Sequence, residues 1–562
     1  MNRNEHLQRL RTEVFDVCII GGGASGAGCA LDAALRGLKV ALVEKTDFAA
    51  GTSSRSTKLV HGGVRYLEQA FKNLDLAQLR QVRHGLAERH TLLTNAPHLA
   101  YPLALLTPVF SWWEGLYLRI GLGLYDWFAA RKDQLPKSRW LSRAAALRRM
   151  PGLSPRIHSA VLYYDGQLDD ARYCLAIVRS AAEAGAVVAN HLEVVDFQNN
   201  AQGQLQSVSV RDDLAKASFG IRARLFLNCT GPYADAIRRL ANPLLASRIR
   251  PSKGVHVVLP SAILGSTDAM LIPKTRDGRM VFAIPFEGQL LLGTTDHDYP
   301  HLDQEPVVDV AEVDFLLTTL QPFVAERLNK QQVKAGFGGL RPLLIGHAAK
   351  APVYAQEHPA VVKKPKSTRR LLRDHEVEYD PVSGLLSLLG GKWTTYRLMA
   401  RDAVDVIGEL LGHPAACATA GHPLVGAADF RPDGWQKLVA AYHFDVTVAQ
   451  HLHQKYGNRA GRVGDLTQAR PILTARLHPD FPYLAAEVIY AAQEEMACTV
   501  RDFLARRIRL EVSDWQAAQA VAPEVARLLG GVFGWSAARQ IAEADHYIDL
   551  ITGFAQQVKT TV

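Results

Sequence analysis

The sequence has few of the features that mark disulfide-rich, zinc-binding or secreted proteins. Its 562 residues contain six scattered cysteines, with no CxxC pair and no Cys/His cluster at metal-ligand spacing. We therefore expect neither a disulfide framework nor a metal site. The first thirteen residues, MNRNEHLQRLRTE, are charged throughout and lack the apolar segment of a secretory signal. The scattered, unpaired cysteines are typical of a protein in a reducing compartment, where cysteine serves as a small buried apolar residue.

Long apolar runs are also absent. None reaches the length of about 18 residues that a membrane-spanning helix needs. The nearest approach, residues 99–113, is interrupted by Pro102 and Pro108 and is followed by Glu114. We therefore expect a protein that is cytoplasmic or attached to a membrane face.

Acidic residues are outnumbered by basic ones, which gives a net charge of +9 and a pI of about 9.1. A basic protein can bind nucleic acid, anionic membranes or phosphorylated metabolites. We expect no nucleic-acid partner, because no zinc finger, RNA-recognition signature or basic leucine zipper accompanies the charge. One basic run lies within residues 344–373, and another, 131–149, follows an aromatic segment that contains Trp112, Trp113, Tyr117, Tyr125 and Trp127. Basic runs are most often solvated surface, but aromatic residues beside Lys and Arg also suit an anionic membrane surface.

Residues 14–44 have the pattern of a dinucleotide-binding turn. An apolar run, 14–20, leads into GGGASGAG, where Gly21, Gly23 and Gly26 form G-x-G-x-x-G. A helical stretch, 27–36, and a second strand, 40–43, follow and end at Glu44. The glycines allow a tight turn, close approach of the backbone to a pyrophosphate, and close packing of helix on strand. The pyrophosphate would lie at the positive end of the helix, and Glu44 would accept hydrogen bonds from a ribose.

The glycine motif fits either NAD or FAD, and the segment that follows favours FAD. Residues 44–68 read EKTDFAAGTSSRSTKLVHGGVRYLE, which is rich in Gly, Ser and Thr. Small residues let the chain pass closely around a large cofactor, and hydroxyl groups bond phosphate and ribose oxygens. Two glycines then precede Arg65, whose guanidinium suits bidentate contact with a phosphate.

Eight segments of the first 400 residues resemble the FAD-dependent, quinone-linked glycerol-3-phosphate dehydrogenases. They are GGGASGAG (21–28), DFAAGTSSRSTKLVHGGVRYLE (47–68), YYDGQLDDAR (163–172), NCTGPYAD (228–235), KGVHVV (253–258), LLGTTD (291–296), GGLRPL (338–343) and GGKWTTYR (390–397). The HGGVRYLE part is fairly specific to this family, whereas many flavoproteins share the glycine motif. The chain departs from the family in a longer and more basic stretch after GGLRPL, and in Trp393, where a smaller aliphatic residue is expected.

The resemblance implies an α/β fold in which a Rossmann-like FAD-binding domain is interrupted by an α+β substrate domain and followed by a helical C-terminal domain. The expected segments are 14–69, 221–244 and 381–417 for the FAD-binding domain, 70–220 and 245–380 for the substrate domain, and 425–562 for the helical domain. The length and the 48% of apolar residues are sufficient for several cores. Strands are expected at 224–229 and 385–389 in the first domain, and at 255–259, 280–286 and 289–293 in the second. The amphipathic patterns after residue 425 carry no identifiable chemistry, so they predict a domain for support, oligomerisation or membrane docking.

The resemblance also implies roles for five residues. Arg65, Tyr66 and Arg341 would hold the phosphate of sn-glycerol 3-phosphate or its neighbouring oxygens. His256 would take the proton of the C2 hydroxyl, and Lys392 would stabilise the negative charge that develops there or on the reduced flavin. Taken singly, His256 in an apolar strand and Arg341 before a proline are more often structural, and the motif context reverses that interpretation. The residues expected to bind FAD are Gly21, Gly23, Ala24, Ser25, Gly26, Glu44, Lys45, Thr52, Ser53, Ser54, Lys58, His61, Gly62, Gly63, Thr230, Gly231, Gly391, Lys392 and Thr394.

The implied activity is oxidation of sn-glycerol 3-phosphate to dihydroxyacetone phosphate, with a hydride passing from C2 to FAD and electrons passing on to a membrane quinone. The implied partners are this substrate, the quinone and an anionic membrane surface, and a homodimer is left open. One alternative is an FAD-dependent oxidase or dehydrogenase of another 2-hydroxy acid or of an amine, because a fold alone never fixes chemistry. Another is a flavin-binding protein without turnover, which damage to His256, Arg341 or Lys392 would indicate.

Overall fold

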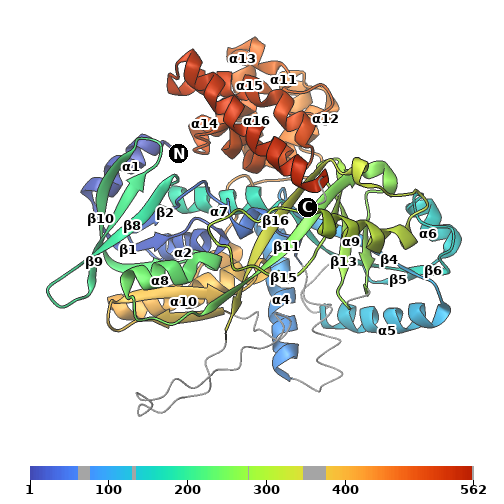
Figure 1. Ribbon diagram of the computed structural model, residues 1–562, viewed down its shortest axis with the longest axis horizontal. Coiled ribbons are helices and arrows are strands. Elements are labelled where there is room, and N and C mark those ends of the chain that lie inside the picture. Colours follow the sequence, from blue (N-terminus) through green and yellow to red (C-terminus); the bar gives the residue numbers. More distant parts are fainter. Residues whose placement is uncertain (61–75, 130–134, 276–277, 346–374, 560–562) are drawn as a thin grey trace.

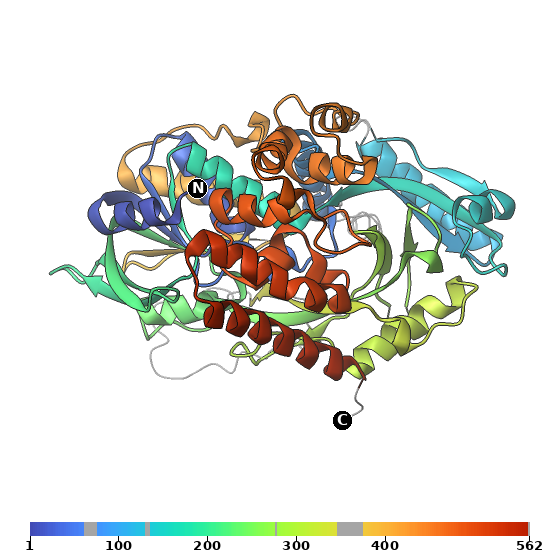
Figure 2. The same cartoon turned by 90° about the horizontal axis from the view of Figure 1, so that it is seen from above.

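The computed structural model describes residues 1–60, 76–129, 135–275, 278–345 and 375–559. Two β-sheets lie side by side, and the C-terminal helices lie across them on one side of the molecule (Figure 1 and Figure 2). The fold class is therefore the expected one: a mixed α/β protein with a helical C-terminal domain.

The first sheet is built on the glycine-rich turn. Its strand order is β17-β18-β10-β1-β2-β7, in which β1 (Val14–Ile20), β2 (Val40–Val43), β7 (Val187–Ala189), β10 (Ala217–Asn228) and β18 (Leu385–Gly390) run parallel to their neighbours. The edge strand β17 (His375–Tyr379) is antiparallel to β18, and the hairpin β8 (Leu192–Asn199) and β9 (Leu205–Asp212) extends β10. The central strands are apolar along most of their length because helices cover them; α2 (Ala24–Leu35) packs between α7 (Asp170–Glu183) and α10 (Tyr396–Leu411).

The first sheet includes more of the chain than the expected segments. Residues 170–220, which we assigned to the substrate domain, form α7, β7, β8, β9 and the start of β10. Strand β7 pairs with β2, with Ala41 opposite Val187, and α7 packs on α2. The expected boundary at residue 220 is therefore wrong, because a three-residue strand gives little periodic signal until its partner strand is known.

The second sheet has the order β15-β11-β14-β13-β12-β4-β6-β3, with β16 (Ala335–Leu344) added to β11 and β5 (Arg139–Ser142) to β6. The strands expected at 255–259, 280–286 and 289–293 correspond to β11 (Ile249–Pro260), β13 (Val281–Phe286) and β14 (Gln289–Gly293). The remaining strands are β3 (Leu59–Val60), β4 (Ala100–Val109), β6 (Ser159–Leu168), β12 (Ala269–Ile272) and β15 (His297–Asp298). Helix α9 (Val310–Leu320) packs against β11, and α4 (Leu76–Asn95) and α5 (Trp112–Ala129) lie beside β4.

The C-terminal domain consists of α11 (Trp435–Tyr442), α12 (Val446–Tyr456), α13 (Ala460–Ala469), α14 (Ala485–Glu494), α15 (Trp515–Phe533) and α16 (Ala537–Lys559), with a π-helical turn, Asp502–Arg507, between α14 and α15. Its buried side chains join those of the second sheet in one continuous hydrophobic core. The backbone N–H of Trp515 also donates to the carbonyl of Lys334, with 3.0 Å between N and O. The C-terminal domain is therefore packed on the second sheet.

Helix α5 carries an exposed apolar face. Trp112, Trp113, Leu116, Tyr117 and Ile120 are all exposed, and Trp113 is 65% accessible. Figure 1 shows α5 on the side of the molecule away from the C-terminal helices. Within the part of the chain that the structure describes, no helix is long and apolar enough to cross a membrane.

Candidate active site

A cavity of about 1540 Å³ lies where the two sheets and the C-terminal domain meet. Its wall includes the β1–α2 turn, the loop after β2, strands β11 and β16, and the turn between β18 and α10. It is larger than the ~300–1,000 Å³ of an ordinary small-ligand pocket, as a dinucleotide together with a second small molecule requires.

The glycine-rich turn has the geometry that a dinucleotide needs. Gly21 has a φ of 109°, and a Cβ there would lie 2.8 Å from the carbonyl oxygen of Cys229. A Cβ on Gly26 would lie 1.9 Å from the carbonyl oxygen of Gly21, so only glycine lets α2 begin this close to β1. Glu44 accepts a hydrogen bond from the backbone N–H of Gly22, with 2.7 Å between N and Oε2, and it lines the cavity. These residues fit FAD.

The loop after β2 is bonded to this turn. The hydroxyl of Ser53 accepts a hydrogen bond from the N–H of Ala24 (2.9 Å), and the hydroxyl of Thr52 donates to the carbonyl of Leu340 on β16 (2.6 Å). Trp393 occupies the position where a smaller side chain is expected, and its Nε1 donates to the carbonyl of Ser53 (2.9 Å). The larger residue thus ties the β18–α10 turn to the loop.

Most of the residues predicted to bind FAD line the cavity. Those that do are Gly21, Gly23, Ala24, Ser25, Glu44, Lys45, Thr52, Ser53, Thr230, Gly231, Gly391, Lys392 and Thr394. Gly26, Ser54 and Lys58 are not among the lining residues. Gly26 acts through packing, and the fully buried Lys58 bonds Asp170 and the carbonyl of Ser54, each at 2.7 Å. Burial lowers the pKa of Lys58 to about 7, although the adjacent Asp170 raises it.

His256 lies on β11 and is almost fully buried, with its ring stacked on Phe337 at 5.0 Å between centroids. Its Nε2 lies 3.1 Å from the hydroxyl of Thr57, and its Nδ1 has no hydrogen-bond partner among the described residues. Burial, and then the charges of Lys58 and Arg341, hold the pKa of His256 well below its ordinary 6.5. A neutral imidazole therefore faces the cavity at neutral pH.

Arg341 and Lys392 line the same cavity as His256. The guanidinium of Arg341 donates to the carbonyl of Thr295 (3.0 Å) and the hydroxyl of Thr294 (3.2 Å), and it lies 3.4 Å from Asp296. A Cβ on Gly254 would lie 2.3 Å from that guanidinium, so a glycine there is what makes room for it. Lys392 precedes the short 3-10 helix Trp393–Thr395 that leads into α10.

Five predicted site residues lie outside the described residues: His61, Gly62, Gly63, Arg65 and Tyr66. Most of the basic stretch 344–373 also lies outside them.

Sequence reasoning missed the contribution of the C-terminal domain, to which we assigned no chemistry. Its lining residues are Thr499, Val500, Arg501, Asp502, Arg506, Glu543, His546, Tyr547 and Leu550. Arg501 pairs with Glu305, which also pairs with Arg55, so ion pairs connect this domain to the loop after β15 and to the loop after β2. Two sequence features could have indicated this contribution. Residues 543, 546, 547 and 550 have the spacing of one helix face, and residues 501–510, RDFLARRIRL, are rich in arginine.

The fold and the cavity define an FAD-dependent oxidoreductase. A family model described as FAD dependent oxidoreductase matches residues 16–397, and one described as the C-terminal domain of alpha-glycerophosphate oxidase matches residues 417–540. The chain is 42% identical to a probable mitochondrial glycerol-3-phosphate dehydrogenase of Caenorhabditis elegans, over 98% of this chain and 75% of that one. It is 39% identical to the mitochondrial glycerol-3-phosphate dehydrogenase of Homo sapiens, over 93% of this chain and 71% of that one. This protein belongs to the glycerol-3-phosphate dehydrogenase family.

Solved structures agree with this assignment. The glycerol-3-phosphate dehydrogenase of Bacillus halodurans, solved with FAD, superimposes with a TM-score of 0.77 at 26% identity and covers 100% of this chain and 99% of its own. An FAD-bound L-alpha-glycerophosphate oxidase of Mycoplasma pneumoniae shares the fold, with a TM-score of 0.52 at 18% identity over 71% of this chain and 95% of its own. FAD is therefore the cofactor of this chain.

Proposed function

We propose that this chain oxidises sn-glycerol 3-phosphate to dihydroxyacetone phosphate. The observation that supports the proposal is that the cationic side chains of Arg341 and Lys392 and the neutral, buried imidazole of His256 line the same cavity as the dinucleotide turn. A phosphate dianion needs cations, and removal of a hydroxyl proton at neutral pH needs a base that is not already protonated.

The proposed roles follow from this chemistry. Bound FAD supplies the acceptor for the hydride that leaves C2. The imidazole of His256 takes the proton of the C2 hydroxyl as that hydride leaves, and Lys392 stabilises the negative charge that develops on the oxygen. Arg341 binds the phosphate together with Arg65 and Tyr66, whose assignment rests on the family resemblance. The hydrogen bonds of Arg341 to Thr294 and Thr295 orient its guanidinium before substrate binds.

The experiment is an anaerobic titration of the purified protein, with the oxidised flavin band monitored by absorbance. We expect sn-glycerol 3-phosphate to bleach the band, and glycerol or lactate at the same concentration to leave it unchanged, because neither carries the phosphate that Arg341 binds. Equal bleaching by lactate or an amine would favour the alternative oxidoreductases. Bound flavin that no phosphate ester bleaches would contradict the proposed substrate.

We also propose peripheral attachment to the inner face of the cytoplasmic membrane and electron transfer to a membrane quinone. The exposed aromatic and aliphatic face of α5 supports attachment, because such a face can enter the headgroup region while nearby basic residues interact with anionic lipid. Quinone reduction and a homodimeric assembly rest on the family resemblance alone.

Attachment through α5 predicts a specific loss of vesicle binding. Replacement of Trp112, Trp113 and Ile120 by serine should reduce co-sedimentation with phosphatidylglycerol vesicles at low salt by about ten-fold or more, because three apolar side chains no longer enter the lipid. The matched control replaces Leu244 and Ile472, which are exposed apolar side chains elsewhere. Binding that is the same in both variants, or absent in the unmodified protein, would rule out this attachment.

A further inference from the structure

Three arginines of the C-terminal domain, Arg506, Arg507 and Arg509, contact the segment that follows β2. We call residues 44–58 the flavin loop, because many of them line the FAD cavity. Arg506 and Arg507 close the π-helical turn Asp502–Arg507, and Arg509 follows it in a left-handed conformation with a φ of 67°. All three guanidinium groups are buried.

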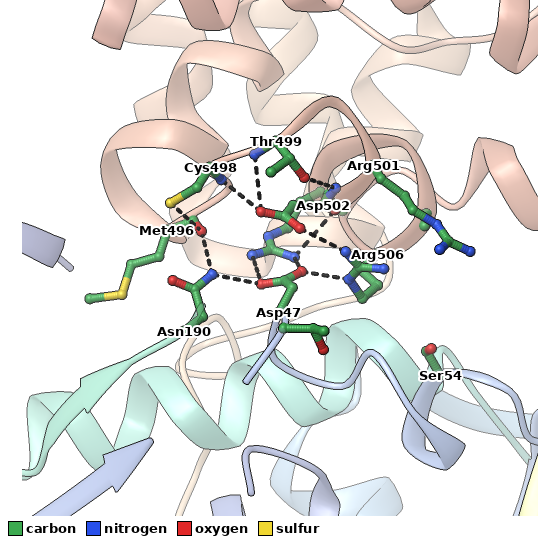
Figure 3. Close-up of polar contacts among 12 residues, drawn as sticks. Asp47, Ser54, Asn190, Met496, Cys498, Thr499, Arg501, Asp502 and Arg506 are labelled. Atoms are coloured by element: carbon green, nitrogen blue, oxygen red, sulfur yellow. Dashed lines mark hydrogen bonds and ion pairs between the residues drawn. The ribbon is translucent and has the colours of Figure 1, made fainter. Parts of the chain in front are cut away.

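The first contact is at Asp47, which is fully buried. Its carboxylate accepts hydrogen bonds from Nε of Arg506 (2.5 Å) and from both terminal nitrogens of Arg507 (2.7 and 3.0 Å). Asn190 also donates to it (3.0 Å). Figure 3 shows Asp47 rising from the flavin loop toward Arg506, with Asp502 above them.

Asp502 holds this contact in place from the C-terminal side. It accepts from Arg506 (2.8 Å) and from the backbone N–H groups of Cys498 (2.9 Å) and Thr499 (3.0 Å), as Figure 3 shows. Nε2 of His191, which follows β7 in the first sheet, lies 2.9 Å from Oδ2 of Asp502, the same oxygen that accepts the two backbone N–H groups. The two domains thus share one network of buried charges.

The second contact is at the far end of the flavin loop. Arg509 donates to the carbonyl of Ser54 (2.9 Å) and to Asp170 (2.8 Å). Lys58 donates to the same carbonyl and to the other oxygen of Asp170. Side chains from the last quarter of the sequence therefore hold the loop at Asp47 and again at the carbonyl of Ser54.

Between these two contacts, the flavin loop is hydrogen-bonded to the glycine-rich dinucleotide turn. The N–H of Ala49 donates to the carbonyl of Gly22 (3.0 Å), and the N–H of Ala24, at the start of α2, donates to the hydroxyl of Ser53 (2.9 Å). A shift of the loop would move groups that line the pyrophosphate end of the cavity.

We propose that Arg506, Arg507 and Arg509 are positioning residues that hold the flavin loop in its FAD-binding conformation. On this basis the C-terminal domain contributes to FAD binding by positioning the flavin loop. Buried guanidinium and carboxylate groups are strongly unfavourable when left unpaired, so loop and domain adopt their positions together. By linkage, docking of the domain strengthens FAD binding, and FAD strengthens docking to the same degree.

The test is the FAD dissociation constant of the full-length apoprotein, measured by quenching of flavin fluorescence. Arg507 is the residue to replace, because it is not among the residues that line the cavity and acts through Asp47. We expect Arg507→Gln to raise the constant by about 10- to 100-fold, as loss of a charged hydrogen-bond pair would. Arg507→Lys, which keeps the charge and loses the paired donors, should lie between this variant and the unmodified protein.

The matched control is Arg36→Gln. Arg36 is equally buried and bonds two carboxylates, Asp32 (2.5 Å) and Asp405 (2.6 Å), but it neither lines the cavity nor touches the flavin loop. It should lower the melting temperature of the apoprotein and leave the FAD constant unchanged. If Arg507→Gln also lowers the melting temperature and leaves the FAD dissociation constant unchanged, the positioning role is refuted.

Hydrogen exchange on the unmodified protein gives a second test that does not depend on a variant folding. Peptides that cover residues 507–512, which do not line the cavity, should exchange more slowly with FAD than without it. Peptides from α11 serve as the reference. Equal exchange of residues 507–512 with and without FAD would overturn the proposal.

Discussion

Replacement of His256 by asparagine is expected to slow flavin reduction by sn-glycerol 3-phosphate by about 10²–10⁴-fold while FAD stays bound. The imidazole is the one neutral buried base placed in the cavity with Arg341 and Lys392 among the described residues. Asparagine fits the space and can still bond the hydroxyl of Thr57, but it cannot take a proton. Stopped-flow reduction under anaerobic conditions measures the rate directly.

The control for this substitution is His98→Asn. His98 is also buried, and burial lowers its pKa to about 3, but it does not line the cavity. Its replacement should leave the rate of flavin reduction unchanged. If both variants reduce the flavin at the unmodified rate, His256 is not the base.

The pH dependence follows from the lowered pKa of His256. In the unmodified protein, the rate of flavin reduction should show no acid limb near pH 6.5, because the imidazole keeps its proton-accepting form below that pH. The same shift affects stability. In the unfolded chain this histidine binds a proton below about pH 6.5, whereas buried His256 does not. The contribution of His256 to the free energy of unfolding is therefore fully present above pH 6.5 and is lost as the pH falls below it.

Substitution of Gly26 by alanine is expected to weaken FAD binding by about a hundred-fold, so that the protein is purified largely without flavin. The added Cβ would lie 1.9 Å from the carbonyl oxygen of Gly21, and this atom is backbone, so no side-chain rotation relieves the overlap. Helix α2 must move away from β1, which displaces the N–H groups that face the pyrophosphate. The flavin-to-protein absorbance ratio and a fluorescence titration measure the effect.

Gly531→Ala is the matched control for this substitution. Gly531 also lies inside a helix, α15, and an added Cβ there meets no atom within 4 Å. It should retain FAD fully and gain a few tenths to about 1 kcal/mol of stability. Full flavin content in Gly26→Ala would show that the close approach at Gly21 is not required.

The part of the site that depends on local chain geometry could be predicted from the sequence. The run of strand, glycines, helix, strand and acid at residues 14–44 forms β1, α2 and β2 as expected, with Glu44 on the turn. That His256, Arg341 and Lys392, which lie in three distant motifs, line one cavity was by contrast expected from the family resemblance and not from local geometry. The β1–α2–β2 elements follow from sequence because glycine conformation and apolar periodicity act over a few neighbouring residues.

Sequence patterns were sufficient to predict the α/β class, the FAD-binding turn, and the residue types that chemistry on a phosphorylated alcohol needs. Long-range packing was needed to show that Lys58 is turned inward to Asp170, that residues 170–220 belong to the first sheet, and that Arg506, Arg507 and Arg509 contact the flavin loop. The physical reason is the same in each case. The partner of a buried charge or of a short strand lies more than a hundred residues away, and its position depends on how the whole core packs, which no local pattern encodes.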